Sequence, residues 1–384
     1  MKILHIAIDQ KFIPFIQTAF ESVWPGENKF TILNTKKNGK WKYTLSNENT
    51  VAGNSIYFFG GKLKQDLQWC DVLIIHFMTP WSAYAAMQAP LNVPVIWSGW
   101  GADYYPLIPG FSDEELVLTE TKKALDKAHE IEKLIEKKQS IINKTKDFII
   151  DTLFIKDSIN RVLSRVDFFS APIKDDYELL KKAFPQITAN YFQINYGSVE
   201  AQQFKDINIV EGNNIIVGNS ATATNNHIEV FKLLTKIDLK DRKIIVPLSY
   251  GDIEYRNEVI RIGESLFGIS FIPLVKFMPL DEYNKIISGC SIVFMNHRRQ
   301  QALGNIISAM LNGSKVILRE DNPLFSFLKR NGAYITAISE IDENPVDLFS
   351  PLTKQQMLVN KEFILSNWEY EIVLNNIRKL SDLK

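Results

Sequence analysis

Short apolar segments alternate along most of the chain with segments whose apolar residues recur at every third or fourth position. The apolar runs predict buried strands, and the amphipathic segments between them predict helices. This alternation indicates an α/β fold with parallel sheets, because neighbouring parallel strands are joined by crossover helices. The near-continuous apolar character of the strands is typical of sheets covered on both faces. Strands are predicted at residues 2–8, 70–76, 94–97, 167–171, 191–193, 215–217, 243–247, 269–274, 291–295 and 315–318.

Two segments interrupt the alternation and divide the chain. Residues 112–165 are dense in charge at helical spacing, which predicts a helical insertion, and residues 198–214 are polar without periodicity, which predicts a linker. A chain of 384 residues also exceeds the usual size of one hydrophobic core. We therefore predict an N-terminal Rossmann-like domain (1–205) that carries the insertion, a C-terminal Rossmann-like domain (206–352) and terminal helices (353–384).

The charged insertion has two interpretations. It is either a helical segment with a solvated face, or an amphipathic surface that rests on lipid headgroups. In the second case its lysines would face anionic lipids. The charge pattern does not decide between them. The lysines concerned are Lys137, Lys138, Lys144 and Lys146.

Composition limits the kinds of partner. The 44 basic and 44 acidic residues balance, which argues against a nucleic-acid partner, so any anion site must be local. The two cysteines, Cys70 and Cys290, lie beside predicted buried strands and match no zinc or disulfide pattern; we expect buried free thiols. The chain starts with a strand and has no signal-peptide pattern or apolar run long enough to cross a bilayer. We expect a cytoplasmic protein that contacts a membrane at most from the side.

The segment from residue 291 to residue 325 holds a candidate anion site. A strand is followed by Arg298 and Arg299, then by a helix over 302–311, a second strand and an acidic loop ending at Asn322. A guanidinium matches phosphate oxygens, and the helix presents free amides from Gln301 to Gly304. A diphosphate would fit there. Alternatively, the two arginines are surface charges that pair with Glu320 and Asp321.

A second candidate phosphate site precedes the helix that follows the strand at 215–217. The loop from Gly218 to His227 is rich in small and hydroxyl residues, whose amides and side chains can cradle phosphate oxygens. A capping loop for the following helix would have the same composition.

The N-terminal half sends polar residues to one sheet edge. His76 and Asp103 follow two predicted strands, and Asp9 follows the first one. Trp100 and Tyr104 beside Asp103 offer ring faces on which a sugar could stack. Structural alternatives exist: a hydrogen-bonded core histidine for His76 and a helix N-cap for Asp9. No G-x-G-x-x-G segment is present, so the dinucleotide fingerprint is missing.

Two Rossmann-like halves without that fingerprint are similar to the GT-B architecture of nucleotide-sugar glycosyltransferases, in which two domains face each other across a cleft. More specifically, the sequence resembles the TDP-N-acetylfucosamine:lipid II N-acetylfucosaminyltransferases, the 4-alpha-L-fucosyltransferase family or glycosyltransferase family 56. The resemblance extends from about His76 to Phe325. It rests on Trp100-Gly101-Ala102-Asp103 with Tyr105, Val217-Gly218-Asn219-Ser220, Asn225 with His227-Ile228, Val246-Pro247 with Tyr250, Arg299-Gln300-Gln301 with Gly304, and Asn322-Pro323.

The resemblance implies transfer of a deoxyamino sugar from a nucleoside diphosphate to a polyprenyl-diphosphate-linked glycan during surface polysaccharide assembly. It implies a peripheral protein on the inner face of the cytoplasmic membrane, with the nucleotide sugar as substrate, no cofactor and no metal. The chain departs from the family at Ala221-Thr222-Ala223, where the family loop is Gly-rich, and in its long insertion. Alternatives are a hexosyltransferase that uses GDP- or UDP-sugars, a nucleotide-sugar epimerase of GT-B form, and a non-catalytic sugar-binding protein.

The resemblance also suggests roles for individual residues. Asp103 is the first candidate for the catalytic base, because its loop can place a carboxylate in the cleft, and His76 is the second. Acceptor-binding candidates are Asp9, Trp100 and Tyr104. Donor-binding candidates are Gly218, Asn219, Ser220, Asn225, His227, Tyr250, Arg299, Gln300, Gln301, Gly304, Asp321 and Asn322.

Overall fold

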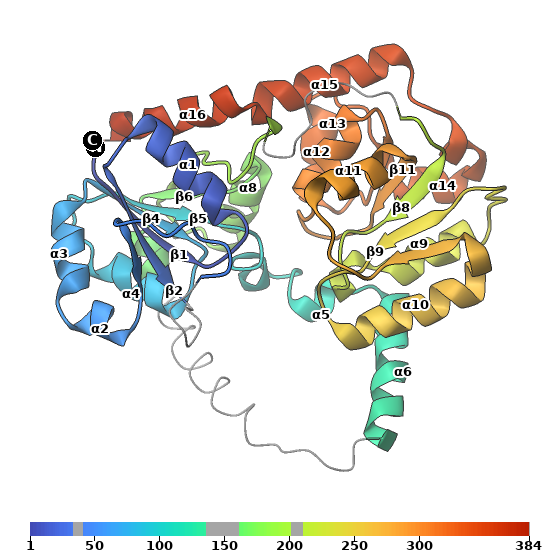
Figure 1. Cartoon of the computed structure of the whole chain (residues 1–384), viewed down its shortest axis with the longest axis horizontal. Coiled ribbons are helices and arrows are strands. Elements are labelled where there is room, and N and C mark those ends of the chain that lie inside the picture. Colours follow the sequence, from blue (N-terminus) through green and yellow to red (C-terminus); the bar gives the residue numbers. More distant parts are fainter. Residues whose placement is uncertain (34–40, 136–160, 201–209, 384) are drawn as a thin grey trace. The chain divides into compact units, whose positions relative to one another are not determined.

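The structure is a computed structural model that describes residues 1–33, 41–135, 161–200 and 210–383. These residues form two compact units, which are described separately below (Figure 1). The first unit comprises Met1–Ile108, Ser140–Ser198 and Tyr370–Lys384, and the second comprises Pro109–Gln139 and Val199–Glu369. No helix among the described residues is long and apolar enough to cross a membrane.

The first unit is built on a parallel sheet of seven strands in the order β3-β2-β1-β4-β5-β6-β7. The order reverses between β1 and β4, so the crevice at their carboxyl ends is the position where such sheets bind ligands. The strands are β1 (Ile3–Ile8), β2 (Asn28–Leu33), β3 (Thr50–Ala52), β4 (Val72–His76), β5 (Val95–Ser98), β6 (Phe168–Ser170) and β7 (Asn190–Tyr191).

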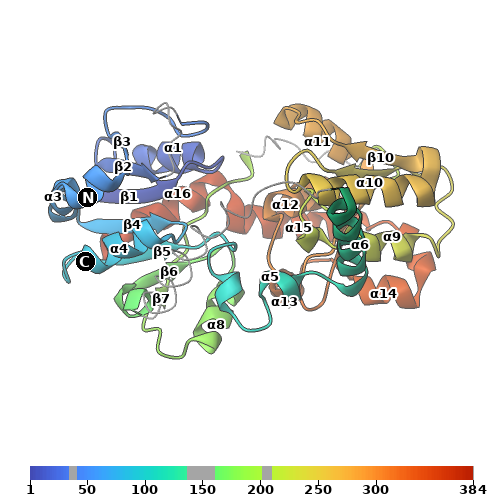
Figure 2. The same cartoon turned by 90° about the horizontal axis from the view of Figure 1, so that it is seen from below.

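Helices cover this sheet, and one of them comes from the far end of the sequence. α16 lies along α1, as Figures 1 and 2 show, and its Val373 and Ile377 are buried in the same core as Ile13 and Phe20 of α1. The core of the first unit is therefore completed by residues more than 340 positions away from α1. The helices are α1 (Ile13–Val23), α2 (Ser55–Phe59), α3 (Lys62–Trp69), α4 (Pro80–Gln88), α8 (Lys174–Ala183) and α16 (Tyr370–Arg378).

The second unit has a parallel sheet of six strands in the order β10-β9-β8-β11-β12-β13. Here the order reverses between β8 and β11, which places the ligand crevice at the loops that follow these two strands. Most strands of both sheets confirm the predicted apolar runs. The strands are β8 (Asn214–Val217), β9 (Ile244–Pro247), β10 (Phe271–Leu274), β11 (Cys290–Met295), β12 (Lys315–Leu318) and β13 (Thr336–Ala337).

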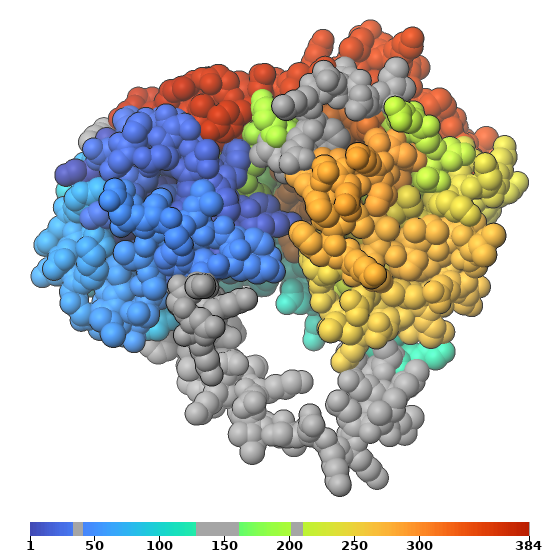
Figure 3. All heavy atoms as spheres, in the orientation of Figure 1, coloured from blue at the N-terminus to red at the C-terminus, as the bar shows by residue number. Residues whose placement is uncertain are grey.

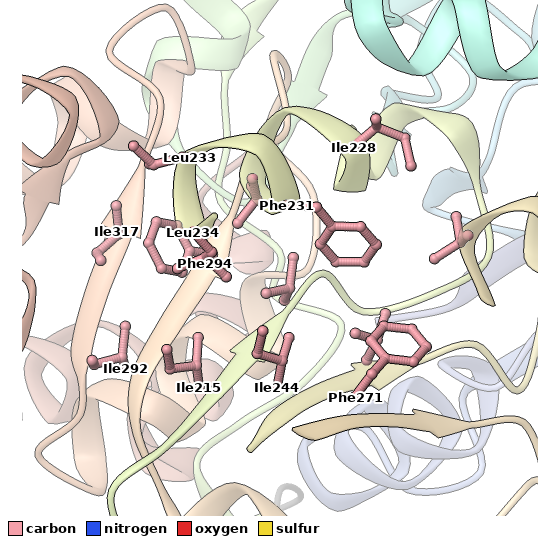
Figure 4. Close-up of a cluster of buried hydrophobic side chains, with 14 of the residues drawn as sticks. Ile215, Ile228, Phe231, Leu233, Leu234, Ile244, Phe271, Ile292, Phe294 and Ile317 are labelled. Atoms are coloured by element: carbon pink, nitrogen blue, oxygen red, sulfur yellow. The ribbon is translucent and has the colours of Figure 1, made fainter. Parts of the chain in front are cut away.

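Apolar strand residues of the second unit pack against α9, as Figure 4 shows. Phe231 and Leu234 of this helix meet Ile215, Ile244 and Phe294 of three adjacent strands in one buried cluster. The helices of the unit are α5 (Asp113–Leu116), α6 (Thr119–Ile135), α9 (His227–Leu234), α10 (Ile253–Phe267), α11 (Leu280–Ser288), α12 (Leu303–Leu311), α13 (Pro323–Arg330), α14 (Ile338–Glu343) and α15 (Lys354–Trp368).

The first part of the predicted insertion packs in the second unit rather than in the N-terminal domain. Glu229 of α9 accepts hydrogen bonds from the backbone amides of Glu120 and Thr121 and from the Thr121 hydroxyl. Ala124 is buried in the core of the second unit. Charge at helical spacing predicted the helix but not the core that it joins. The lysines proposed to contact lipid lie in 136–160, outside the described residues.

Both cysteines are free and buried, as the sequence predicted. Burial raises the pKa of each thiol to about 12. Neither thiol is therefore a thiolate at neutral pH.

Candidate functional site

The loops that follow β8 and β11 are joined by one buried side chain, Asn225. Its Oδ1 accepts hydrogen bonds from the Asn219 amide (2.8 Å) and from His297 Nε2 (3.0 Å). Its Nδ2 donates to the hydroxyls of Ser220 (3.0 Å) and Thr222 (2.8 Å) and to the Thr222 carbonyl (3.0 Å). A single amide thus fixes both walls of the crevice at the switch point of the second sheet.

Gly218 begins this crevice, and no other residue fits its position. Its φ is +70°, and a Cβ there would lie 2.5 Å from His227 Nε2 and 2.7 Å from Asn225 Oδ1. A side chain would therefore clash with two buried groups and strain the backbone as well. The loop can approach a ligand with its backbone because it carries no side chain at this point.

His227 supports the loop from beneath. It is fully buried, with Nδ1 2.9 Å from the Tyr255 hydroxyl, and burial lowers its pKa to about 3. His227 Nε2 and His297 Nδ1 have no hydrogen-bond partner within the described part of the chain. The expectation that the His227 side chain contacts the donor directly is not met by this geometry, because its ring is covered by Gly218.

Polar side chains predicted to bind the donor meet at the rim of the crevice. Asn219 Nδ2 donates to the hydroxyl of the half-exposed Tyr250 (3.0 Å), and the Thr224 hydroxyl donates to Gln301 Oε1 (3.0 Å). Gln301 Nε2 lies 3.5 Å from Asn219 Oδ1. The sequence alone does not show that the loops after β8, β9 and β11 approach each other; the structure brings these residues together.

The helix that follows β11 starts beside the same rim. Its N-cap residue, Ala302, has a φ of +60° and makes no side-chain cap, and Gly304 lies in the first turn of α12. The amides of a helix N-terminus and the positive end of its dipole favour an anion. The sequence pattern predicted a helix over 302–311, and the structure has it at Leu303–Leu311.

The two arginines of the β11 loop have different surroundings. Arg298 pairs with Asp321 (2.9 Å), and this pairing is the alternative that the sequence analysis considered for the arginines. Arg298 also donates a hydrogen bond to the Glu115 carbonyl. Asp321 also pairs with Arg319; burial would raise the Asp321 pKa, but these two guanidinium groups lower it. Arg299 donates to the Gln300 carbonyl (3.2 Å). Asp321 is thus a counter-ion of arginines, and its direct contact with the donor stays a prediction.

Asn322 and Gln300 are buried. Asn322 Oδ1 caps α13 through the Leu324 amide, and its Nδ2 donates to the carbonyls of His297 and Arg299, all at 2.9 Å. Asn322 therefore fixes the backbone that carries Arg299. The prediction that it touches the donor is not supported, since its polar atoms are used within the protein.

In the first unit, Asp103 connects the loops after β4 and β5. Its carboxylate accepts hydrogen bonds from the Met78 amide (2.9 Å), the Trp97 indole (2.8 Å) and the Trp100 amide (2.8 Å). Burial raises its pKa, and these three donors oppose that shift. The backbone amide of Asp103 itself is a further donor that opposes the shift. The carboxylate lies next to the switch point of this sheet.

His76 does not face this edge, so the prediction of an exposed base there is wrong. Its ring is fully buried, with Nε2 2.9 Å from Nδ1 of His5. Burial lowers the pKa of His76 to about 3. The sequence placed His76 at the end of a strand but could not show that its side chain points into the core.

Tyr104 is also wrong as a sugar-stacking residue, because it is fully buried. Its hydroxyl donates to Asp176 (2.7 Å), as does that of Tyr105 (2.5 Å). Asp9 is occupied as well: it accepts hydrogen bonds from the backbone amides of residues 42–44 and from the Thr44 hydroxyl, so it holds a loop. A direct role of Asp9 in acceptor binding stays a prediction.

Trp100 remains at the edge and is partly exposed, with other aromatic rings around it. Its ring lies 5.5 Å from that of Phe12, 5.9 Å from that of Phe77 and 6.0 Å from that of Tyr196. Phe77 has a φ of +75°, a strained conformation that occurs mostly at functional positions. Sequence reasoning missed Phe12, Phe77 and Tyr196, because neither spacing nor residue type marked them.

Tyr104→Phe should destabilise the first unit without changing acceptor affinity. The substitution removes one hydrogen bond to a buried carboxylate, which typically costs about 1.5–3 kcal/mol. Urea unfolding measures the stability, and the Michaelis constant for acceptor measures affinity. An increased Michaelis constant at unchanged stability would restore the stacking role.

No group of three His, Cys, Asp or Glu residues that could hold a metal occurs within the described ranges. The candidate site of the second unit therefore consists of backbone amides, amide and hydroxyl side chains and Arg299.

Comparison with known proteins identifies relatives of both the sequence and the fold. A family model described as 4-alpha-L-fucosyltransferase glycosyl transferase group 56 matches residues 172–367, just over half of the chain. Sucrose-phosphate synthase from Thermosynechococcus elongatus has a similar structure, with a TM-score of 0.65 and 9% identity over 100% of this chain and 99% of that one.

Two further solved structures are comparably similar. Anabaena Alr3699/HepE in complex with UDP has a TM-score of 0.62 and 11% identity, with all of both chains covered. The lipopolysaccharide outer core galactosyltransferase WaaB has a TM-score of 0.61 and 10% identity over 100% of this chain and 99% of that one. At such identities the likeness shows the fold, which confirms the predicted GT-B class with its two parallel α/β units.

Proposed function

Since the chain belongs to the 4-alpha-L-fucosyltransferase family, glycosyl transferase group 56, we propose that it transfers an N-acetylfucosamine-type deoxyamino sugar to a polyprenyl-diphosphate-linked glycan. The chain is a glycosyltransferase of the hexosyl-transferring class. The donor would be a nucleoside-diphosphate sugar. Anabaena Alr3699/HepE, which shares the fold, was solved with UDP and with UDP-glucose, and this supports a nucleotide-sugar donor.

The observation that supports the proposed donor site most strongly is the crevice fixed by Asn225. Its walls are the Gly218–Ser220 backbone and the start of α12, and Arg299 lies in the β11 loop. We propose that the donor diphosphate binds here, held by loop amides, by the helix N-terminus and by the Arg299 guanidinium. Tyr250, Asn219 and Gln301 at the rim are then suited to hydroxyl groups of the nucleoside or sugar.

The same groups would stabilise the reaction. When the glycosidic bond to the diphosphate breaks, negative charge grows on the departing phosphate. A fixed guanidinium and helix amides stabilise that charge without reorganisation. The acceptor hydroxyl must lose its proton as it attacks, and we propose Asp103 of the first unit as the base. In this scheme the protein's own cationic groups carry out the task that a metal performs in other transferases.

Arg299→Ala should weaken binding of the donor nucleotide by roughly ten- to a hundredfold. Loss of a charge-assisted phosphate contact costs about 1.5–3 kcal/mol, and about 1.4 kcal/mol corresponds to a factor of ten. Calorimetric titration with the nucleoside diphosphate measures the effect. Arg319→Ala is the matched control, because Arg319 pairs with Asp321 and should leave affinity nearly unchanged.

The donor nucleotide is identified by thermal shift with TDP-, UDP- and GDP-sugars. Stabilisation follows the ratio of ligand concentration to dissociation constant, so the preferred donor gives the largest shift. We expect the TDP-sugar to rank first. A larger shift with a UDP- or GDP-hexose would replace the donor in this proposal with that sugar. A second assay separates a transferase from an epimerase: a transferase releases nucleoside diphosphate only when a glycan acceptor is present.

A polyprenyl-linked acceptor keeps its diphosphate at the bilayer surface, so the enzyme must work there. We propose a peripheral protein at the inner face of the cytoplasmic membrane. The described part of the chain offers no membrane-spanning helix, and docking would then depend on surface residues.

A further inference from the structure

Helices α2 and α4 of the first unit expose an unusual number of large apolar side chains. Ile56 is 77% exposed and Phe59 67%, while Trp81 and Met87 are 39% and 37% exposed. Tyr84 is partly exposed between them. We call Ile56, Phe59, Trp81, Tyr84 and Met87 the aromatic patch. Large exposed apolar patches mark surfaces that bind a partner.

The patch is continuous rather than scattered. The Phe59 ring lies 5.8 Å from that of Trp81 and 5.6 Å from that of Tyr84. Tyr84 and Met87 are three positions apart on α4, so they share one helix face. Figure 1 shows α2 and α4 at the same end of the first unit, and Figure 3 shows the light-blue segments of this region at the surface.

The helices that carry the patch contain no charged residues. No Asp, Glu, Lys or Arg occurs from Phe77 to Ala102, and α2 has none either. The exposed charges beside α2 are those of Lys62 and Lys64 on α3. The acid of that helix, Asp66, is buried and paired with Lys29 and Lys62. An apolar aromatic surface with a basic rim is complementary to anionic lipid headgroups over a hydrocarbon layer.

The composition favours a bilayer over a protein partner. Tryptophan and tyrosine are enriched at the level of lipid headgroups, where an apolar ring and a polar tip are both accommodated. The patch combines them with a phenylalanine, an isoleucine and a methionine that would enter the acyl boundary. It lacks an arginine and any acidic side chain, which would fix a specific protein partner by ion pairs.

The patch lies at the functional edge of the sheet. α4 begins directly after the loop that follows β4, where the Thr79–Ser82 capping box fixes its first turn. The amide of Met78 in that loop is bonded to Asp103. α2 likewise follows the carboxyl end of β3. A partner bound to the aromatic patch would therefore lie near the sheet edge that carries Asp103.

We infer that the aromatic patch docks the first unit on a bilayer that contains anionic lipids, with the exposed Lys64 of α3 towards the headgroups. The inference builds on the proposed lipid-linked acceptor, since docking at this edge would present the acceptor to Asp103. It differs from the sequence-based alternative in which the insertion would rest on lipid headgroups.

An exposed apolar residue in the other unit provides the control. Ile269 is 89% exposed just before β10, and its carbonyl accepts a hydrogen bond from Lys243. It belongs to the second unit, whereas the aromatic patch belongs to the first. Because the inference assigns docking to the aromatic patch alone, substitution of this isoleucine should leave vesicle binding unchanged.

The test is co-sedimentation of the full chain with phosphatidylcholine vesicles containing 30% phosphatidylglycerol, without donor or acceptor. We expect binding by the unaltered protein, and a decrease in affinity of about tenfold or more for the double variant Phe59→Ser/Trp81→Ser. Ile269→Ser should bind normally. Lys64→Glu should weaken binding at low salt and remove most of its salt dependence.

Several results would overturn the inference. They are absence of vesicle binding by the unaltered protein, equal binding by the double variant, or a stronger effect of Ile269→Ser than of the double variant. A double variant that loses self-association instead of vesicle binding would assign the patch to a second copy of the chain. Transfer to a detergent-soluble acceptor should be unchanged in the double variant, so a failed docking surface is distinguishable from a failed transferase assignment.

Discussion

Asp103→Asn is expected to lower turnover by about 10²–10⁴-fold while nucleotide binding is preserved. A general base contributes about this factor, and an amide cannot accept the proton of the attacking hydroxyl. Nucleotide affinity should hold because the proposed donor site is built entirely from the second unit. The measurements are the turnover number with saturating donor and acceptor, and calorimetric titration with the nucleoside diphosphate.

The same carboxylate also organises a loop, and the experiment must separate the two roles. Asparagine would turn an NH2 group towards one of the three donors that Asp103 now satisfies, at a cost of about 1–3 kcal/mol. Urea unfolding of the variant measures this cost. A turnover that falls only in proportion to the unfolded fraction would make Asp103 a loop residue and leave the base unassigned.

Asp176→Asn is the matched control for this substitution. Asp176 is a fully buried carboxylate of the same unit that accepts hydrogen bonds from two tyrosine hydroxyls. Its substitution should reduce stability by a similar amount. Once the folded fraction is taken into account, its turnover should stay close to that of the unaltered protein, in contrast to Asp103→Asn.

Acidification from pH 7 to pH 5 is expected to remove at least about 2 kcal/mol of stability from each unit, the effect of one buried histidine. The first unit buries His5 and His76 completely, and the second buries His227 and His297. Burial lowers the pKa of all four, to about 3 for His76 and His227. Each such group contributes about 1.4 kcal/mol per pH unit below the unfolded-state pKa of about 6.5.

The direction follows from proton uptake. Between about pH 6.5 and pH 3 the unfolded chain protonates His76 and His227 and the folded chain does not, so stability rises with pH across this window. The stability contribution is complete above pH 6.5 and is lost as the pH falls below it. Domain stabilities are about 5–15 kcal/mol, so this loss is a large fraction of the total.

Urea unfolding midpoints between pH 4.5 and pH 8 test this expectation. His76→Asn should make the pH dependence of the first unit shallower, and His227→Asn should do the same for the second, even where each variant is less stable at pH 7. Equal midpoints at pH 7 and pH 5 would contradict the buried neutral state of the histidines.

The sequence predicted strands well and side-chain directions poorly. Runs such as 72–76 and 290–295 are apolar throughout because helices cover both faces, so their positions could be read directly. The same uniformity hides which face a terminal residue takes. His76 therefore looked like an edge residue although it points into the core, and Tyr104 looked like a sugar platform although it binds Asp176.

The loops of the candidate donor site could be located in outline for a related reason. Gly218 and Gly304 could be located at strand ends and at a helix start from local patterns alone. The pairing of Arg298 with Asp321, the buried support from Asn322 and the packing of α6 on α9 depend on contacts between distant segments. No local sequence pattern shows these contacts. The sequence therefore could not distinguish residues at the rim of the crevice from buried residues that support it.

The position of α16 has a consequence for synthesis. The ribosome makes the strands and helices of the first unit up to Ile108 early, but Val373, Ile377 and Leu380 complete their core. At 5–20 residues per second, the intervening stretch takes on the order of 10–50 s to translate. Throughout that interval the surface of the first unit that α16 later covers stays exposed, so the nascent unit should be less stable until α16 emerges.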